Sequence, residues 1–312
     1  MKKFNSNGKL LITGEYLILD GALSLAAPCK LWQSLIFIPH QKQTLNWKSY
    51  DVNGKLWFES VFKADNLEIV ETSDIDTVNW LKKILLFCFK NSNKNFCGTI
   101  SCHLDFPNNW GLGSSSSLIN NISQLYGLDP FEIHFATTNG SGYDIACANS
   151  KSALTYQLSD NKPEIKNIHW DPDFKNDISF IFLNKKQNSY LEIKRFQSLK
   201  KDLGLINEVS DLTKKIIAST TLKEFEELID IHEKIIGNLI GVEPVKKQLF
   251  SDYNGSIKSL GAWGGDFIMA TKNNKNYFLN KGYHTIIPFN EIIKKSTLKI
   301  ASWKPTISNI TQ

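Results

Sequence analysis

The sequence predicts an α+β fold, with strands concentrated in the first part of the chain and helices in the second. Between residues 8 and 70, segments with alternating or continuous apolar residues are separated by turn signals such as Asn53-Gly54. Between residues 190 and 240, apolar residues recur at helical spacing. At 312 residues, the chain is long enough for two domains or for one large one.

The first part of the chain is predicted to begin with the strands Lys9–Thr13, Leu31–Ile38, Thr44–Tyr50 and Lys55–Phe62. Asp74 or Asp76 can cap a helix that runs to about Lys90, because an aspartate side chain accepts from the free N–H groups of the first turn. A further strand is expected from Phe96 to Phe106, and it stops at Pro107.

A stretch rich in glycine and serine, Asn108 to Asn121, follows this strand and reads N-N-W-G-L-G-S-S-S-S-L-I-N-N. An apolar pattern at helical spacing continues from it and ends at Gly127. The first turn of a helix leaves N–H groups unpaired and carries partial positive charge, so such a turn suits the phosphates of a nucleotide. The stretch lacks the Gly-Lys-Ser/Thr of P-loop NTPases. The alternative is a serine N-cap after a flexible loop.

The next elements are shorter. Asp129-Pro130 is typical of an N-cap and the first residue of a helix, predicted to reach Thr137. A small-residue loop over 139–144 precedes a helix that begins near Ile145, and Ala153–Leu158 is a predicted strand. The polar stretch Ser159–Asp177 is interpreted as the connection between two domains.

The second part of the chain is predicted to be mainly helical, with a small sheet. The expected helices are Tyr190–Leu203, Ile206–Ser219, Leu222–Ile240 and one from Pro244 toward Tyr253. The expected strands are Ile178–Leu183, Phe267–Ala270, Tyr277–Leu279 and Thr285–Pro288.

Composition narrows the class of protein. The five cysteines include no C-x-x-C pair, which favours free thiols in a reducing cytoplasm. The net charge of +5 comes from scattered lysine doublets, with Arg195 as the only arginine, so no basic stripe indicates a nucleic-acid partner. No secretory signal and no run long enough to cross a bilayer is evident. We therefore expect a cytoplasmic protein, monomer or homodimer, with neither nucleic-acid nor membrane partners.

Three segments together resemble the ordered motifs of the GHMP small-molecule kinases, a superfamily that includes galactokinase, homoserine kinase, mevalonate kinase and phosphomevalonate kinase. They are Ser6–Ala22, Pro107–Ser117 and Lys258–Asp266, near the start, middle and end of the chain. The segment Gly142–Ala146, G-Y-D-I-A, also resembles the signature of a bacterial subgroup named for it. Within the superfamily, Glu15-Tyr16 looks more like the phosphomevalonate kinases, because mevalonate kinases usually place histidine after that glutamate.

The resemblance implies a two-domain α+β GHMP kinase fold. Residues 1–165 would form a ribosomal protein S5 domain 2-like N-terminal domain that contains the phosphate loop. Residues 166–312 would form a ferredoxin-like C-terminal domain.

The resemblance also implies a role for individual residues. Asp144 matches the aspartate that takes the proton of the accepting hydroxyl, and Lys9 matches the lysine beside it that stabilises negative charge. The residues that match the phosphate loop are Gly111, Leu112, Gly113, Ser114, Ser115 and Ser116. The residues that match the substrate side and the third motif are Glu15, Tyr16, Ser141, Gly261, Ala262, Gly264 and Gly265. Taken singly, Asp144 could instead form an Asx-turn, Lys9 could be an exposed strand lysine, and Glu15 a turn carboxylate.

ATP and Mg²⁺ are the expected cofactors, and Ser115 matches the serine whose hydroxyl ligates the metal. Two departures from the family pattern bear on the site. Ile133 stands where mevalonate kinases place a second metal-binding carboxylate, so either the adjacent Glu132 serves or Ser115 and the nucleotide hold Mg²⁺ alone. Trp263 interrupts the small residues of the third motif, where it could narrow the phosphate site or pack on a substrate.

The expected function is ATP-dependent phosphorylation of a small alcohol or phosphate. The resemblance favours phosphomevalonate or mevalonate of the isoprenoid pathway as the acceptor. The alternatives are a GHMP kinase for a sugar or for homoserine, and a non-catalytic protein of the same fold that binds a ligand. A nucleic-acid-binding module is a further alternative, against which the scattered lysines argue.

Overall fold

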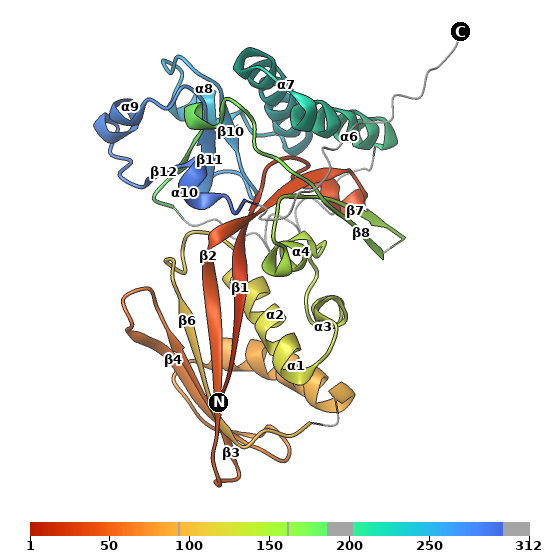
Figure 1. Cartoon of the computed structure of the whole chain (residues 1–312), viewed down its shortest axis with the longest axis vertical. Coiled ribbons are helices and arrows are strands. Elements are labelled where there is room, and N and C mark those ends of the chain that lie inside the picture. Colours follow the sequence, from red (N-terminus) through yellow and green to blue (C-terminus); the bar gives the residue numbers. More distant parts are fainter. Residues whose placement is uncertain (93, 161, 186–201, 296–312) are drawn as a thin grey trace. The chain divides into compact units, whose positions relative to one another are not determined.

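The computed structural model describes residues 1–92, 94–160, 162–185 and 202–295 (Figure 1). The helix expected over Tyr190–Leu203 lies almost wholly outside these residues, as does Arg195. The chain forms two compact units. The first unit contains residues 1–9 and 29–149, and the second contains residues 10–28 and 150–312.

The two units divide the chain differently from the domains expected at residues 1–165 and 166–312. The division passes through β1 (Lys2–Leu11) and β2 (Ser24–Pro39), so each of these strands begins in one unit and ends in the other. The domain boundary near residue 165 therefore stays a prediction.

The first unit is built on a sheet with the strand order β5-β4-β3-β6-β2, and β1 pairs with β2. Its remaining strands are β3 (Thr44–Tyr50), β4 (Leu56–Lys63), β5 (Ile69–Thr72) and β6 (Gly98–Leu104). The β3–β6 pair is parallel, whereas β2–β6, β3–β4 and β4–β5 are antiparallel. Its helices are α1 (Ile75–Ser92), α2 (Ser114–Tyr126), α3 (Pro130–Thr137) and α4 (Tyr143–Asn149).

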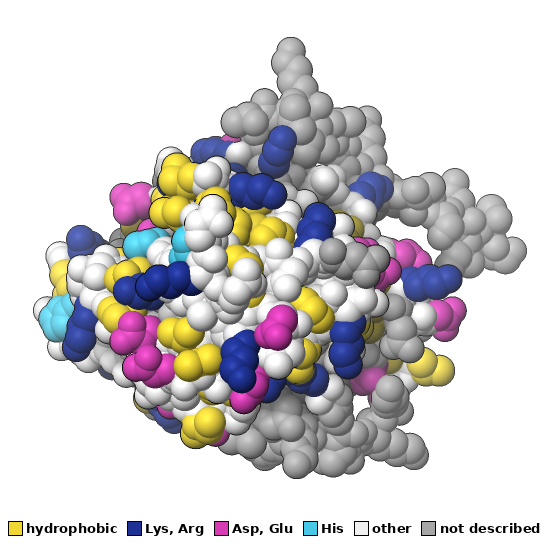
Figure 2. Space-filling view, turned by 90° about the horizontal axis from the view of Figure 1, so that it is seen from below, with side chains coloured by type: hydrophobic (Ala, Val, Ile, Leu, Met, Phe, Trp, Pro, Cys, Tyr) yellow, Lys and Arg dark blue, Asp and Glu magenta, His cyan; other side chains and the backbone are white. Residues whose placement is uncertain are grey.

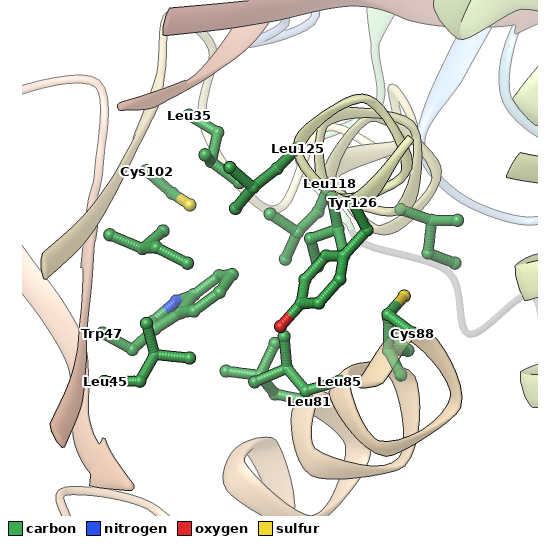
Figure 3. Packing of buried hydrophobic residues seen from close by; sticks show 14 of the residues in the cluster. Leu35, Leu45, Trp47, Leu81, Leu85, Cys88, Cys102, Leu118, Leu125 and Tyr126 are labelled. Carbon is green, nitrogen blue, oxygen red and sulfur yellow. The ribbon is translucent and has the colours of Figure 1, made fainter. Parts of the chain in front are cut away.

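The core of the first unit lies between this sheet and its helices (Figure 3). Burial alternates along β3, so that Leu45 and Trp47 face inward, as a period of two requires. They meet Leu81 of α1 and Leu125 of α2, which lie on the apolar faces of those helices. Each such side chain contributes roughly 1.5–3 kcal/mol on burial. The core thus fixes α2, and with it the phosphate loop, against the sheet.

The second unit contains two sheet portions. The start of β2, Ser24–Ala26, pairs with β7 (Leu154–Ser159), which pairs with β8 (Lys162–Asn167). A separate antiparallel sheet has the order β10-β11-β9-β12, formed by β9 (Ser179–Phe182), β10 (Ile257–Ser259), β11 (Phe267–Ala270) and β12 (Ile286–Pro288). The helices are η1 (Leu17–Asp20), η2 (Lys175–Asp177), α6 (Leu203–Ala218), α7 (Leu222–Ile240), α8 (Val245–Leu249), α9 (Lys275–Asn280) and α10 (Phe289–Ile292).

One expectation about local structure is wrong. The polar stretch Ser159–Asp177, for which no strand was expected, also contains β8, whose side chains are mostly exposed and whose backbone pairs with β7. The segment Tyr277–Leu279, expected as a strand, lies inside α9. Asn274 caps this helix, because its side chain accepts a hydrogen bond from the Tyr277 N–H at 3.2 Å. A cap of this kind decides between helix and strand in an apolar run too short to show a period.

All five cysteines are free thiols. Lysine and acidic side chains are interspersed on the face seen in Figure 2. None of the helices in the described part of the chain is both long and apolar enough to cross a membrane.

Candidate active site

The phosphate loop leads into α2 through a glycine and not through a serine. Gly113 is the N-cap residue, with φ of 85°, and no side chain caps the helix. The alternative interpretation, a serine N-cap, is therefore wrong. An α-helix offers its own first N–H groups no acceptor, so the amides that begin α2 are available to a ligand. Ser115 is exposed at this end of the helix, as a metal ligand would need to be.

Lys9 of β1 holds this loop. Its backbone N–H donates a hydrogen bond to the carbonyl oxygen of Leu112 at 2.9 Å. Its side-chain stem lies so close to Gly113 that a Cβ added there would stand 2.9 Å from Lys9 Cγ. The same Cβ would stand 2.8 Å from the hydroxyl oxygen of Ser116. Lys9 and the phosphate loop therefore form one compact arrangement within the first unit.

Replacing Gly113 by Ala is expected to weaken binding of Mg·ATP by at least tenfold, since 1.4 kcal/mol corresponds to a factor of ten. The added methyl group forces Lys9 or Ser116 to move, and the left-handed φ is strained for alanine. Titration calorimetry with a non-hydrolysable ATP analogue measures the change.

Gly127→Ala is the matched control for this prediction. Gly127 ends α2 with φ of 73°, so alanine meets a similar backbone strain there, while its Cβ would meet only the end of the Lys94 side chain. Nucleotide affinity should be unchanged in this variant. Equal affinity in both alanine variants would remove Gly113 from the binding site.

Asp144 lies in the first turn of α4 and is partly buried. Its Oδ1 accepts a hydrogen bond from the N–H of Ile145 at 3.0 Å. The ammonium of Lys9 lies 5.4 Å from the ring centroid of Tyr143, the residue next to Asp144. The structure thus brings Lys9 to the start of the same short helix that carries Asp144, within one unit.

Tyr143 is a residue of this arrangement that the sequence analysis did not single out. Burial raises the pKa of its hydroxyl to about 12, and Lys9 opposes that rise. The ring therefore remains neutral and forms a cation–π contact with the lysine. The sequence signal for Tyr143 was its position in the G-Y-D-I-A segment, directly before Asp144, the expected proton acceptor.

The remaining predicted residues of the first unit lie on neighbouring segments. Ser141 is buried just before α4. Glu132 is exposed on the first turn of α3, whereas Ile133 is fully buried in the core of the unit. Among the described residues, no group of three or more His, Cys, Asp or Glu side chains could hold a metal ion. The assignment of Glu132 to Mg²⁺ stays a prediction.

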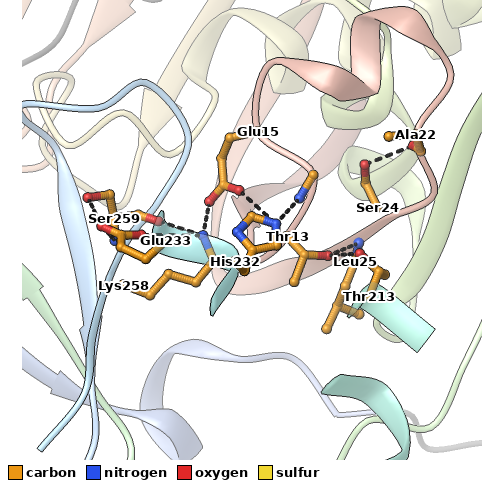
Figure 4. A network of polar contacts seen from close by, with 11 residues as sticks. Thr13, Glu15, Ala22, Ser24, Leu25, Thr213, His232, Glu233, Lys258 and Ser259 are labelled. Carbon is orange, nitrogen blue, oxygen red and sulfur yellow. Dashed lines mark hydrogen bonds and ion pairs between the residues drawn. The ribbon is translucent and has the colours of Figure 1, made fainter. Parts of the chain in front are cut away.

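Glu15 belongs to the second unit, where it takes part in a buried charge network (Figure 4). We use this name for Glu15, His232, Glu233 and Lys258. Glu15 forms an ion pair with Lys258, and its other carboxylate oxygen lies 3.6 Å from His232 Nε2. Lys258 Nζ also lies 4.0 Å from Glu233, which accepts from the Ser259 hydroxyl at 2.7 Å. Glu15 therefore lies in a turn, as the alternative interpretation has it, but its carboxylate is buried and paired with Lys258.

The network holds two carboxylates for one ammonium, and this imbalance governs its protonation. Burial raises the pKa of Glu15 to about 7 although Lys258 opposes the shift. Burial also raises the pKa of Glu233, again against Lys258. The pKa of His232 is held well below its ordinary value by burial and by Lys258, so this ring is neutral. Accordingly, the N–H of Gly14 donates to His232 Nε2 at 3.0 Å.

Glu15→Gln is expected to change how stability depends on pH. Since the pKa of Glu15 rises from 4.5 to about 7 on folding, its contribution is complete below pH 4.5 and is lost as pH rises through 7. Across that window the wild type should lose on the order of 3 kcal/mol relative to the glutamine variant, at 1.36 kcal/mol per pKa unit. Urea unfolding of both proteins at pH 5 and pH 8 measures this difference in unfolding free energy. The same difference at both pH values would contradict the raised pKa of Glu15.

The third glycine-rich segment follows β10 in the second unit. Gly261 and Gly264 have φ of 63° and 93°, values that favour glycine. Trp263 packs in a hydrophobic cluster with residues of α6 and α7, including Val209 and Ile236. Its backbone N–H donates to the Tyr16 hydroxyl at 3.2 Å. Ala262 is buried, and Gly265 completes the segment. The indole is thus a core side chain of its own unit.

Several solved structures similar to this chain are small-molecule kinases. A mevalonate kinase superposes with a TM-score of 0.70 at 14% identity, covering 95% of this chain and 100% of that one. Streptococcus pneumoniae phosphomevalonate kinase, in complex with phosphomevalonate and AMPPNP, superposes with a TM-score of 0.66 at 16% identity, covering 92% of this chain and 100% of that one. Lactococcus lactis galactokinase, complexed with galactose, superposes with a TM-score of 0.65 at 17% identity, covering 96% of this chain and 95% of that one. No protein-family model matches the chain, and no curated protein matches its sequence.

Proposed function

We propose that this chain, which has the fold of the GHMP small-molecule kinases, transfers the terminal phosphoryl group of ATP to a small alcohol or phosphate. The observation that carries the proposal is the arrangement of Lys9, the uncapped start of α2 and Asp144 in one unit. Phosphoryl transfer depends mainly on positioning and charge stabilisation, and these groups supply both.

Each group has a distinct part in the proposed reaction. The first amides of α2 would bind phosphate oxygens, and the Ser115 hydroxyl would hold Mg²⁺, which would neutralise charge on the phosphates. Asp144 accepts the proton of the attacking hydroxyl. Lys9 stabilises the negative charge that develops between the loop and α4, because its stem packs on Gly113 while its ammonium faces Tyr143. A Lys9→Met variant would keep the packing of the aliphatic side chain on Gly113 and remove only the positive charge.

The proposed acceptor is mevalonate or phosphomevalonate. Glu15-Tyr16 and Asp144-Ile145-Ala146, which resemble phosphomevalonate kinases, support it, as does the likeness to two kinases whose names give these substrates. A sugar is the second candidate, because the galactokinase that binds galactose matches the chain almost as well. The burial of Glu15 favours a scaffolding role for this residue over direct contact with either acceptor.

A screen of ADP release tests the proposal. The purified protein is incubated with Mg·ATP and, separately, with mevalonate, phosphomevalonate, galactose and homoserine. Release above the rate without acceptor is expected with one of the first two, whereas a response to galactose alone would favour the sugar kinase. Nucleotide binding without release for any acceptor would instead indicate a ligand-binding protein, the alternative that Ile133 leaves open by replacing a metal-binding carboxylate.

A further inference from the structure

A buried polar network lies beneath the phosphate loop, and the proposed reaction does not use it. We call Ser6, Gln33, Ser117, Asn120 and Asn121 the α2 anchor. All of these side chains are at most 5% exposed, and all belong to the first unit. They join α2 to β1 and β2 on the side of the helix that is not packed in the apolar core.

The anchor is a continuous chain of hydrogen bonds. Asn120 Nδ2 donates to the hydroxyl of Ser6 at 2.8 Å, and that hydroxyl donates to Asn121 Oδ1 at 2.7 Å. Asn121 Nδ2 donates to the backbone carbonyl of Gln33 at 2.9 Å. The hydroxyl of Ser117 donates to Gln33 Oε1 at 2.7 Å. Buried polar groups without partners are costly, so these hydrogen bonds favour a single position of α2 relative to β1 and β2.

Ser117 connects the anchor to the loop. Its hydroxyl oxygen also lies 3.0 Å from the carbonyl oxygen of Gly113 and 3.1 Å from that of Ser114. A serine hydroxyl carries one proton, which serves one of these acceptors at a time. Serines in helices often contact carbonyls three or four residues earlier. Here the hydroxyl donates to Gln33 on β2, so the first turn of α2 is tied to the sheet through one side chain.

The anchored carbonyls determine where the loop amides point. The carbonyl of Leu112 accepts from the backbone N–H of Lys9 at 2.9 Å, and the carbonyl of Gly113 accepts from the backbone N–H of Ser117 at 3.0 Å. The described chain contains no cis peptide bonds, and in a trans peptide the N–H points opposite to the C=O. The amides of Gly113 and Ser114 therefore point away from β1 and from the anchor. This is the arrangement that a phosphate-binding loop requires.

We infer that the α2 anchor is a positioning device for nucleotide binding, and that the hydrogen bond between Ser117 and Gln33 acts in it by holding the first turn of α2 on β2. This inference rests on the proposed function, since it assigns a role in binding the phosphates of ATP. Neither residue touches the nucleotide. Their removal should therefore weaken nucleotide binding, while acceptor binding stays unchanged.

Ser117→Ala and Gln33→Met are the test variants. Each is expected to raise the dissociation constant of a non-hydrolysable ATP analogue with Mg²⁺ about tenfold, or about 1.4 kcal/mol, as for loss of one buried hydrogen bond. The double variant should be little worse than either single one, because both remove the same contact. The Michaelis constant for the acceptor should not change.

Ser123→Ala is the matched control, because Ser123 is also buried on α2 and donates only to the carbonyl of Asn120, at 2.8 Å. It should lose similar stability and keep full affinity for the nucleotide. Equal affinities in Ser117→Ala and Ser123→Ala, with normal binding by the wild type, would overturn the inference alone. A wild type that binds no nucleotide would overturn the proposed function with it. Should Ser117→Ala fail to fold, Gln33→Met decides by the same criterion.

Discussion

Replacing Lys258 by Met is expected to lower the free energy of unfolding by about 3–5 kcal/mol at pH 8, the range for removing one partner of a buried ion pair. Lys258 is fully buried and pairs with Glu15, with Glu233 4.0 Å away. Methionine keeps much of the volume of the side chain but leaves two buried carboxylates without a cation. This is the largest stability effect that we expect from a single substitution in the second unit.

The effect of Lys258→Met should shrink as the pH falls. The pKa values of Glu15 and Glu233 are already raised by burial, and removing the ammonium raises them further. At pH 5 both carboxyls of the variant can therefore bind protons, which removes much of the uncompensated charge. Urea unfolding of wild type and variant at both pH values measures the difference.

Lys63→Met provides the matched control for this experiment. Lys63 pairs with Glu68 at 2.7 Å, and both side chains are more than half exposed. Exposed pairs add little to stability, so this variant should unfold like the wild type at either pH. If Lys258→Met were as stable as the wild type at pH 8, the buried charge network would have no role in holding the second unit together.

The second large effect is expected from Asp144→Asn, which should lower kcat by about 10²- to 10⁴-fold, the usual contribution of a general acid or base. Asparagine keeps the size of the side chain, but its amide cannot take the proton of the acceptor. Because the phosphates are bound by the loop, the affinity for Mg·ATP should remain within a factor of about two, or 0.4 kcal/mol. Steady-state rates and calorimetry together separate the two effects.

Asp129→Asn is the control for Asp144→Asn. Asp129 caps α3 by accepting from the Phe131 N–H at 2.8 Å, and asparagine caps helices equally well. The same chemical change should therefore leave both kcat and stability unaltered at this position. A normal rate in Asp144→Asn would mean that another group accepts the proton.

The elements with strong local signals could be predicted from the sequence. Thr44–Tyr50, Leu222–Ile240 and Phe267–Ala270 have the predicted bounds, because alternation, helical spacing and flanking glycines are local properties. The strands β5 and β10 were missed, since they contain only four and three residues and are defined by their partners. The helix α9 was missed because a single cap outweighed a strand-like run.

Part of the candidate site could likewise be predicted, because some of its residues belong to local sequence motifs. The glycines and serines of the phosphate loop form a local motif, and Lys9 and Asp144 were identified through resemblance to a family. Long-range polar contacts left no such signal. The ion pair of Glu15 and Lys258 joins residues 243 positions apart, and the hydrogen bond between Ser6 and Asn121 joins residues 115 apart. Only the fold makes these side chains neighbours.

The most direct measurement is the transfer of label from ATP labelled in its terminal phosphoryl group. Wild type and Asp144→Asn are incubated with Mg·ATP and a mixture of mevalonate and phosphomevalonate, and label is counted in the acceptor pool. The structure and the proposed roles lead us to expect labelled acceptor with the wild type and almost none with the variant, although both bind the nucleotide. Equal labelling by the two proteins would contradict the assignment. So would a wild type that binds ATP but labels no acceptor, when galactose and homoserine are tested in the same way.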